Sequence, residues 1–263
     1  MNSRIFSIVA LGLSVGCGGK DKDAASNDES GKPAAGGAAT ATTETAGARG
    51  GGSISGMVMF TGTAPKNPTI DMSEEAACKA KYPSPPMNPL VAVTGGHLAN
   101  VFVYVKSGLP AGARYAAPTT AAVIDQDGCL YHPRVFGVMV GQPIEIKNSD
   151  PTLHNIKAVP TANRGFNISQ PSKGMTTTRT FATEEVMVPL QCNVHSWMSA
   201  HVGVMSHPFF ATSGGDGAFM ISGLPAGTYE LVAWHETLGT RTMTVTVGAD
   251  EKKTADFSFA PKA

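Results

Sequence analysis

Short runs of β-forming residues, separated by turn residues, recur along this chain from residue 53 onwards. They cover residues 54–60, 98–105, 143–147, 176–181, 186–192, 200–205, 218–221, 228–234, 242–247 and 254–259. Turn signals at a spacing of roughly 8–12 residues are typical of sandwiches and barrels. We find no convincing amphipathic helix of about four turns. The sequence therefore predicts an all-β fold.

The composition supports an all-β fold and argues against nucleic acid as a partner. The 263 residues carry a formal net charge of +0, and only 15% of them are charged. This balance gives no reason to expect nucleic acid as a partner. With 30 Gly and 18 Pro, the chain suits strands and turns better than helices. No internal apolar stretch reaches the roughly 18 residues of a transmembrane helix, so we predict no membrane span.

The N-terminus is typical of an export signal. Arg4 gives a short basic start, and the apolar run 5–15 is too short to cross a bilayer. The segment 1–17 resembles a bacterial lipoprotein signal, which implies lipidation at Cys17. The alternative is an ordinary cleaved signal with an incidental Cys. The resemblance places the protein in the cell envelope, periplasmic or anchored to the outer membrane, and attached to the membrane through a lipid only.

Residues 18–52 contain no Val, Ile, Leu, Met, Phe, Trp or Tyr. Such a segment cannot bury enough apolar surface to offset the entropy of ordering it. We therefore predict a disordered linker, with an r.m.s. reach of about 30–35 Å if it behaves as a coil.

The chain has four Cys, at positions 17, 78, 129 and 192. If Cys17 belongs to the signal and Cys192 to a metal site, Cys78 and Cys129 remain. An exported protein meets an oxidising compartment, so we predict a Cys78–Cys129 disulfide. The alternative is that one of the two is a buried free thiol or a further soft metal ligand.

One thiolate, one imidazole and one thioether follow a strand-like run at the spacing Cys-x2-His-x2-Met. They belong to Cys192, His195 and Met198, and a second imidazole, His154, follows an upstream run. Two His, one Cys and a weak axial Met form the ligand set of a blue-copper centre, which suits both Cu(I) and Cu(II). The sequence therefore predicts one type 1 copper site with these four ligands.

Residues 142–207 resemble a cupredoxin. The matching elements are a strand leading to Asn-x-Asp-x-x-x-His-Asn, which carries His154, then a Thr-rich strand, the Cys-x2-His-x2-Met loop and a Gly-containing final strand. The loop has the short form of amicyanin-like cupredoxins. The resemblance implies a Greek-key sandwich. It also implies that Asn155 hydrogen-bonds across to the Cys loop. Gln191 and Ser196 depart from the residues often found at those places.

The family's use of its C-terminal His implies that His195 is exposed and is the electron port, with Trp197 in the apolar surface around it. The alternation over 186–192 also predicts that Val186 and Cys192 share the core face of one strand. Because Pro189 cannot donate a ladder hydrogen bond, we expect this strand to be an edge strand or to carry a bulge.

The segment 216–259 resembles a carboxypeptidase regulatory-like, transthyretin-like β-sandwich. The likeness rests on Asp-Gly-Ala-Phe at 216–219 and on Leu-Pro-Ala-Gly-Thr-Tyr-Glu-Leu at 224–231. We divide the folded part into a cupredoxin-like domain with an N-terminal β extension, 53–211, and the regulatory-like segment, 212–263. About 45 residues are few for a whole sandwich. Strands from 53–110 could therefore join it, with the copper region inserted between, and the sequence leaves this topology open.

The resemblance implies an electron carrier that is not an enzyme and that exchanges electrons with a c-type cytochrome or with a copper or quinone enzyme. Two alternatives stay open: a copper storage or delivery protein, and a β-sandwich binding module without a redox role. A multicopper oxidase needs His on both sides of the Cys, whereas Gln191 and Asn193 stand there. A binuclear copper centre needs two Cys in this loop, and the loop has one.

Overall fold

The computed structural model describes residues 43–44 and 51–261. The predicted signal peptide 1–17 with its lipidated Cys17, and most of the predicted linker 18–52, lie outside the described residues. Within the linker range, β1 (Thr43–Glu44) pairs in parallel with β6 (Arg114–Tyr115), and Gly52 already belongs to β2.

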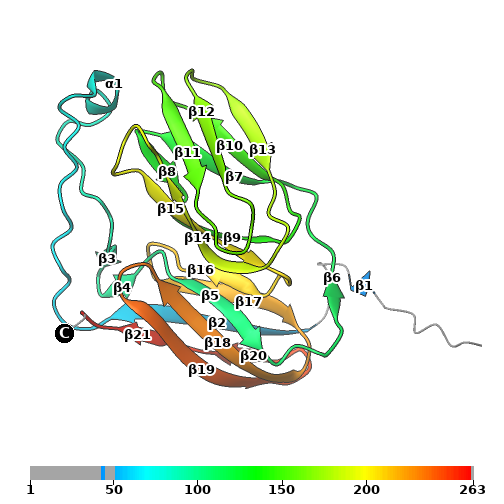
Figure 1. The fold of residues 1–263 in the computed structure, drawn as a ribbon. Helices are drawn as coiled ribbons and strands as arrows, with labels where there is room; N and C mark the ends of the chain where they lie inside the picture. Colours follow the sequence, from blue (N-terminus) through cyan, green and yellow to red (C-terminus); the bar gives the residue numbers. More distant parts are fainter. Residues whose placement is uncertain (1–42, 45–50, 262–263) are drawn as a thin grey trace, which may run out of the picture. The chain divides into compact units, whose positions relative to one another are not determined.

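The first sandwich combines two sheets formed from the middle of the chain (Figure 1). In one, the order is β13 (Thr176–Arg179), β10 (Ile144–Asn148), β7 (Ala122–Asp127) and β8 (Leu130–His132). In the other, it is β12 (Phe166–Gln170), β11 (His154–Ala158), β14 (Glu185–Gln191), β15 (Ser199–Met205) and β9 (Val135–Met139). Pairs β7–β10 and β9–β15 are parallel. A core cluster with Ile124, Ile146, Ile156 and Val202 joins both sheets.

The strand that leads to Cys192 differs in one respect from its predicted form. β14 lies between β11 and β15, so it is not an edge strand. Its register shifts between Glu185 and Val188, where Met187 adopts a φ of 64°. This bulge changes the alternation, so Val186 is 38% exposed and the prediction of Val186 on the core face was wrong. The bulge itself had been expected.

The second sandwich is formed from strands that come before and after the first one in the sequence (Figure 1). One sheet has the order β16 (Phe210–Thr212), β5 (Phe102–Ser107), β18 (Gly227–His235) and β19 (Gly239–Val247). The other has β17 (Ala218–Leu224), β2 (Gly52–Phe60), β4 (His97–Leu98) and β3 (Val93–Thr94), with β20 (Lys252–Thr254) and β21 (Phe257–Phe259) paired to β2. Strands β2 and β5 thus pair with β17 and β18, and the strands of the first sandwich lie between them in sequence.

The predicted all-β fold is confirmed, and the two sandwiches have separate cores. The core of the second includes Ile54, Val103, Tyr229 and Leu231. A third, smaller cluster joins strands of both: Phe102, Val135, Met187 and Met205. Among the described residues, no helix is long and apolar enough to cross a membrane.

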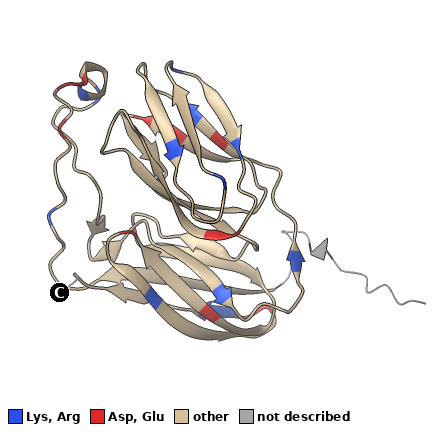
Figure 2. Ribbon diagram, viewed as in Figure 1, with Lys and Arg blue, Asp and Glu red and all other residues tan. Residues whose placement is uncertain are grey.

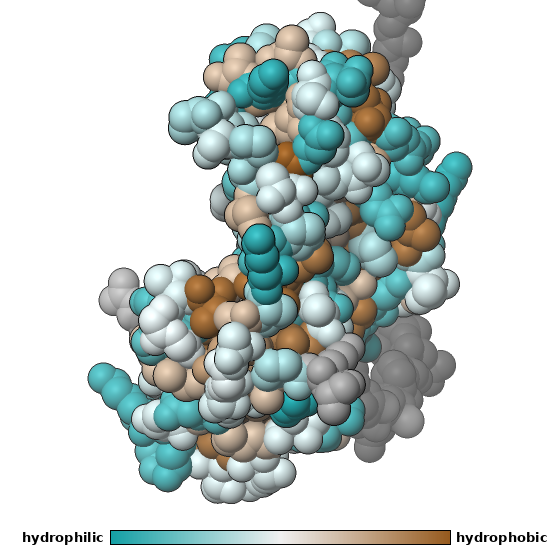
Figure 3. Space-filling view, turned by 90° about the vertical axis from the view of Figure 1, so that its left-hand side faces the viewer, coloured by the Kyte–Doolittle hydropathy of each residue, from teal (hydrophilic) through white to brown (hydrophobic). Residues whose placement is uncertain are grey.

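Charged side chains of both signs are interspersed over the strands, in keeping with the balanced composition (Figure 2). On the face that Figure 3 displays, polar and apolar residues are likewise mixed.

The segment before the first sandwich contains the short helix α1 (Ala76–Lys79). Cys78 in this helix forms a disulfide with Cys129 in the turn between β7 and β8, with Cα atoms 5.5 Å apart. The pair that was expected to be oxidised is therefore oxidised, and α1 is attached to the first sandwich.

Candidate metal centre

The loop between β14 and β15 is closed by its own backbone. The Cys192 N–H donates to the Met198 carbonyl over 3.2 Å, and the Met198 N–H donates to the His195 carbonyl over 3.0 Å. Because the flanking strands are paired up to Gln191↔Ser199, both ends of the loop are fixed by the sheet. Three of the four predicted ligands are therefore held in one short turn.

The fourth predicted ligand, His154, is the first residue of β11, which is the neighbour of β14 in the sheet. Its Nδ1 lies 3.0 Å from Nδ1 of His195, which in turn lies 4.0 Å from Sγ of Cys192. The donor atoms of these three residues lie within 4.8 Å of one another. The exposed fractions are 0% for both His and 6% for Cys192. The sheet thus brings together three of the predicted ligands in a buried cluster.

Met198 is 1% exposed and belongs to the core of the first sandwich. Its backbone closes the ligand loop, which places the residue beside the cluster in sequence and in space. Axial coordination by its thioether stays a prediction.

The surroundings of the Cys192 sulfur stabilise its thiolate form. It accepts the N–H groups of Val194 and His195 over 3.4 and 3.3 Å. Burial opposes ionisation, but hydrogen bonds from the side chains of His154 and His195 and from these two N–H groups outweigh it and lower the pKa of Cys192 to about 5. Since the thiolate is the form that binds metal, the thiol is ready to coordinate at neutral pH.

The surroundings of the two imidazoles differ, and those of His154 fix the tautomer of its neutral ring. Nε2 of His154 lies 2.9 Å from Asp150 Oδ2, which accepts a hydrogen bond, so the Nε2 of His154 carries a hydrogen. Nε2 of His195 faces two acceptors, Glu75 Oε2 at 3.6 Å and Cys78 Sγ at 3.8 Å. The Nδ1 atoms of both rings face the cluster, and which of them donates to the other depends on the tautomer of His195.

Two imidazole nitrogens 3.0 Å apart, next to the Cys192 sulfur, need either a hydrogen on one of them or a cation between them. Burial lowers the pKa of His154, but its hydrogen bonds to Asp150 and Cys192 outweigh this and raise it. Two imidazole nitrogens and one thiolate are soft and borderline donors that suit copper. The donor set of this structure therefore fits the predicted metal.

Asn155 makes the contact that the resemblance implied. Its side-chain oxygen accepts the N–H of Asn193, 3.1 Å away in the ligand loop. Its amide donates to the Ile168 carbonyl over 3.0 Å, and the Tyr131 hydroxyl donates to its backbone carbonyl. Asn155 thereby ties the Cys192 loop to β11 and β12.

Asp150 is a site residue that the sequence reasoning missed. It is 1% exposed and hydrogen-bonds to a predicted ligand. Burial raises the pKa of Asp150, but hydrogen bonds from His154, from the Cys129 N–H and from Lys81 outweigh it and hold the pKa well below the ordinary range. A carboxylate four residues before a predicted His ligand was the available signal.

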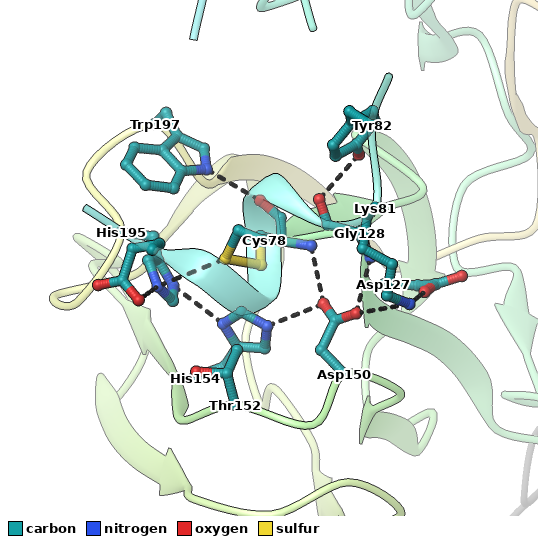
Figure 4. The surroundings of a disulfide bond; sticks show 12 residues. Cys78, Lys81, Tyr82, Asp127, Gly128, Asp150, Thr152, His154, His195 and Trp197 are labelled. Atoms are coloured by element: carbon teal, nitrogen blue, oxygen red, sulfur yellow. Dashed lines mark hydrogen bonds and ion pairs between the residues drawn. A yellow bond between two sulfur atoms is a disulfide. The ribbon is translucent and has the colours of Figure 1, made fainter. Parts of the chain in front are cut away.

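The prediction that His195 is exposed was wrong, and its role as an electron port stays a prediction. The ring is 0% exposed, because Glu75 and Cys78, in the segment that contains α1, cover its outer nitrogen. Figure 4 shows Cys78 beside the His195 ring. Trp197 does lie against it, with ring centroids 5.1 Å apart, and its indole N–H donates to the Cys129 carbonyl over 3.0 Å. The segment that seals His195 is far away in the sequence, so the loop motif alone could not reveal it.

Comparison with known proteins gives partial likenesses only. No family model matches the chain, and no curated protein matches its sequence. A purple cupredoxin from Nitrosopumilus maritimus aligns with 32% of this chain and 98% of its own, at 22% identity and a TM-score of 0.28.

Two further solved structures also align with only part of this chain, at low sequence identity. A methionine-to-alanine mutant of amicyanin, in its Cu(I) form, aligns with 39% of this chain and 97% of its own, at 20% identity and a TM-score of 0.29. The copper-containing nitrite reductase of Thermus scotoductus SA-01 aligns with 46% of this chain and 27% of its own, at 16% identity and a TM-score of 0.32. Likeness at this level concerns the fold of one part, so copper binding is inferred from the geometry of the site itself.

Proposed function

We propose that this protein binds one copper ion at His154, Cys192 and His195, with Met198 as a weak axial ligand, and transfers single electrons between redox partners in the cell envelope. The observation that carries the proposal is the buried convergence of two imidazole Nδ1 atoms and one thiolate. Copper bound there supplies reversible one-electron chemistry between Cu(I) and Cu(II).

The chain's own residues hold the donors in a fixed arrangement. The backbone bonds of the 192–198 loop, Asn155 on the loop, and Asp150 on His154 all restrain the ligands. Ligands held in place in this way keep nearly the same positions in both oxidation states, so the reorganisation energy of electron transfer is small. No bond chemistry on a substrate is proposed, so the protein is not proposed to be an enzyme.

Electron exchange needs a surface close to the ligands. Val194 and Leu153, each next in sequence to a His ligand, are 43% and 40% exposed. With the ring of Trp197 against His195, they offer apolar contacts for a partner such as a c-type cytochrome or a copper or quinone enzyme. A lipidated Cys17 would tether the protein to a membrane that faces an oxidising compartment.

Storage or delivery of copper is the competing use of the same ligands. A buried site favours retention, because a chelator must first open the structure to reach the metal. The test is to load the full chain with copper, record its potential by spectroelectrochemistry, and challenge the Cu(I) form with a Cu(I) chelator. A reversible one-electron wave with slow copper loss supports a carrier. Rapid and complete copper transfer to the chelator supports delivery and contradicts the carrier.

A further inference from the structure

Asp150 connects the proposed copper ligands to the disulfide-bonded segment. Its Oδ2 accepts from His154 Nε2 over 2.9 Å and from the Cys129 N–H over 2.7 Å. Its Oδ1 accepts from the Gly128 N–H and from Lys81 Nζ, each over 3.0 Å. Figure 4 shows the carboxylate between the His154 ring and Lys81. Four donors therefore surround a carboxylate that has almost no contact with solvent.

Hydrogen bonds within the turn between β10 and β11 orient the Asp150 carboxylate. The Asp150 N–H donates to Asn148 Oδ1 over 2.9 Å, and the Asn148 amide donates to the Thr152 carbonyl over 3.0 Å. These bonds shape the turn between β10 and β11 so that Asp150 points back under His154. A buried carboxylate is costly unless it is fully hydrogen-bonded, and here every partner is in place.

We infer that Asp150 is a positioning residue that sets the reduction potential of the site, an inference that rests on the proposed copper function. The Asp150 carboxylate holds the His154 hydrogen on Nε2, so Nδ1 keeps its lone pair for the metal. A negative charge hydrogen-bonded to the ligand also makes the imidazole a stronger donor. This second effect stabilises Cu(II), the more positive ion, over Cu(I), and so lowers the potential.

Lys81 provides a second test of the same inference, because its removal should shift the reduction potential in the opposite direction. The ammonium group partly neutralises Asp150, and it belongs to the segment that Cys78 attaches to the sandwich. Without the Lys81 ammonium group, the negative charge of Asp150 is less compensated, so Cu(II) is favoured further over Cu(I). Substitutions of the two partners should therefore move the potential in opposite directions, which loss of structure alone does not produce.

The test compares Asp150→Asn and Lys81→Met with the wild-type protein, all copper-loaded, by spectroelectrochemistry. Asp150→Asn should weaken Cu(II) binding about tenfold relative to Cu(I) and raise the potential by about 59 mV. Lys81→Met should lower it. The matched control is Asp127→Asn, since Asp127 is the other carboxylate on Lys81, 3.0 Å away and 57% exposed, and should leave the potential close to wild type.

A metal-free measurement keeps the test independent of copper. Two-bond ¹H–¹⁵N NMR of the wild-type protein should show the His154 hydrogen on Nε2. In Asp150→Asn the amide can donate as well as accept, so part of the His154 population should carry it on Nδ1.

An unchanged potential in Asp150→Asn, or a shift of the same sign in both variants, contradicts the inference. So does an unchanged His154 tautomer. Absence of a thiolate-to-copper band in the wild-type protein contradicts the proposed function instead, and the tautomer measurement then still decides the role of Asp150.

Discussion

The Nε2 atom of His195 lies 3.8 Å from Sγ of Cys78, so the sulfur of a disulfide covers the outer edge of a proposed copper ligand. The same segment places the Glu75 carboxylate 3.6 Å from this nitrogen. Beyond the disulfide, it is held by the Tyr82 hydroxyl on the Gly128 carbonyl, over 2.8 Å, and by the ion pairs of Lys81. The cover is thus attached by one covalent bond and a few polar contacts.

Replacing both Cys78 and Cys129 by Ser should open this cover. We expect a loss of about 2–4 kcal/mol in stability, because the unfolded chain is no longer cross-linked. Copper should also leave to a chelator about tenfold faster, since His195 becomes accessible. Tyr82→Phe is the control, because it removes one contact of the segment and keeps the disulfide. Copper loss at the wild-type rate in the double variant would show that the disulfide does not protect His195.

Asn155→Ala should loosen the ligand loop, since it removes the acceptor of the Asn193 N–H. The expected cost is about 1–2 kcal/mol in thermal unfolding, together with weaker copper retention. Asn67→Ala is a matched control: Asn67 makes two 2.9 Å hydrogen bonds to the backbone of Val91, which belongs to the other core. Equal copper retention in the two variants would contradict the proposed role of Asn155.

The Glu185 carboxylate should give a pH-dependent stability that is separate from the metal site. Burial raises its pKa, but the N–H groups of Thr161 and Ala162 and the side chain of Asn163 together outweigh this and lower it to about 2. A lowered pKa contributes stability above the unfolded value of 4.5, and that contribution fades as the pH falls toward 2.

Glu185→Gln should therefore cost about 1 kcal/mol at pH 7 and progressively less below pH 4.5, the ordinary pKa of the carboxyl group. Chemical unfolding of both proteins across this range measures the difference. Glu184→Gln, at an exposed neighbouring position, serves as control. A Glu185→Gln penalty that grows as the pH falls would overturn this sign.

The sequence predicted those parts of the site that depend on local spacing. Cys192, His195 and Met198 lie in one loop, so their proximity follows from the motif and the strands around it. The contact of Asn155 with that loop follows from its place directly after His154. Counting the cysteines predicted the Cys78–Cys129 pair, on the expectation that the chain is exported to an oxidising compartment.

Features that depend on distant contacts were not predictable in this way. The Cys78 sulfur that covers His195 stands 117 positions before it, and no local pattern encodes that approach. The exposure of Val186 depends on a bulge at Met187, a residue with positive φ that a periodicity argument does not foresee. Asp150 was visible in the sequence, but its role needs the turn that aims it at His154.

The central claim is that Cys192 and the two histidines bind copper as a type 1 centre. The most direct measurement is the visible and EPR spectrum of the full chain after addition of Cu(II), alongside Cys192→Ser and Met198→Leu. We predict an intense blue charge-transfer band that is lost in Cys192→Ser and retained, at an altered potential, in Met198→Leu. A colourless wild-type protein, or a band that survives Cys192→Ser, would contradict the claim.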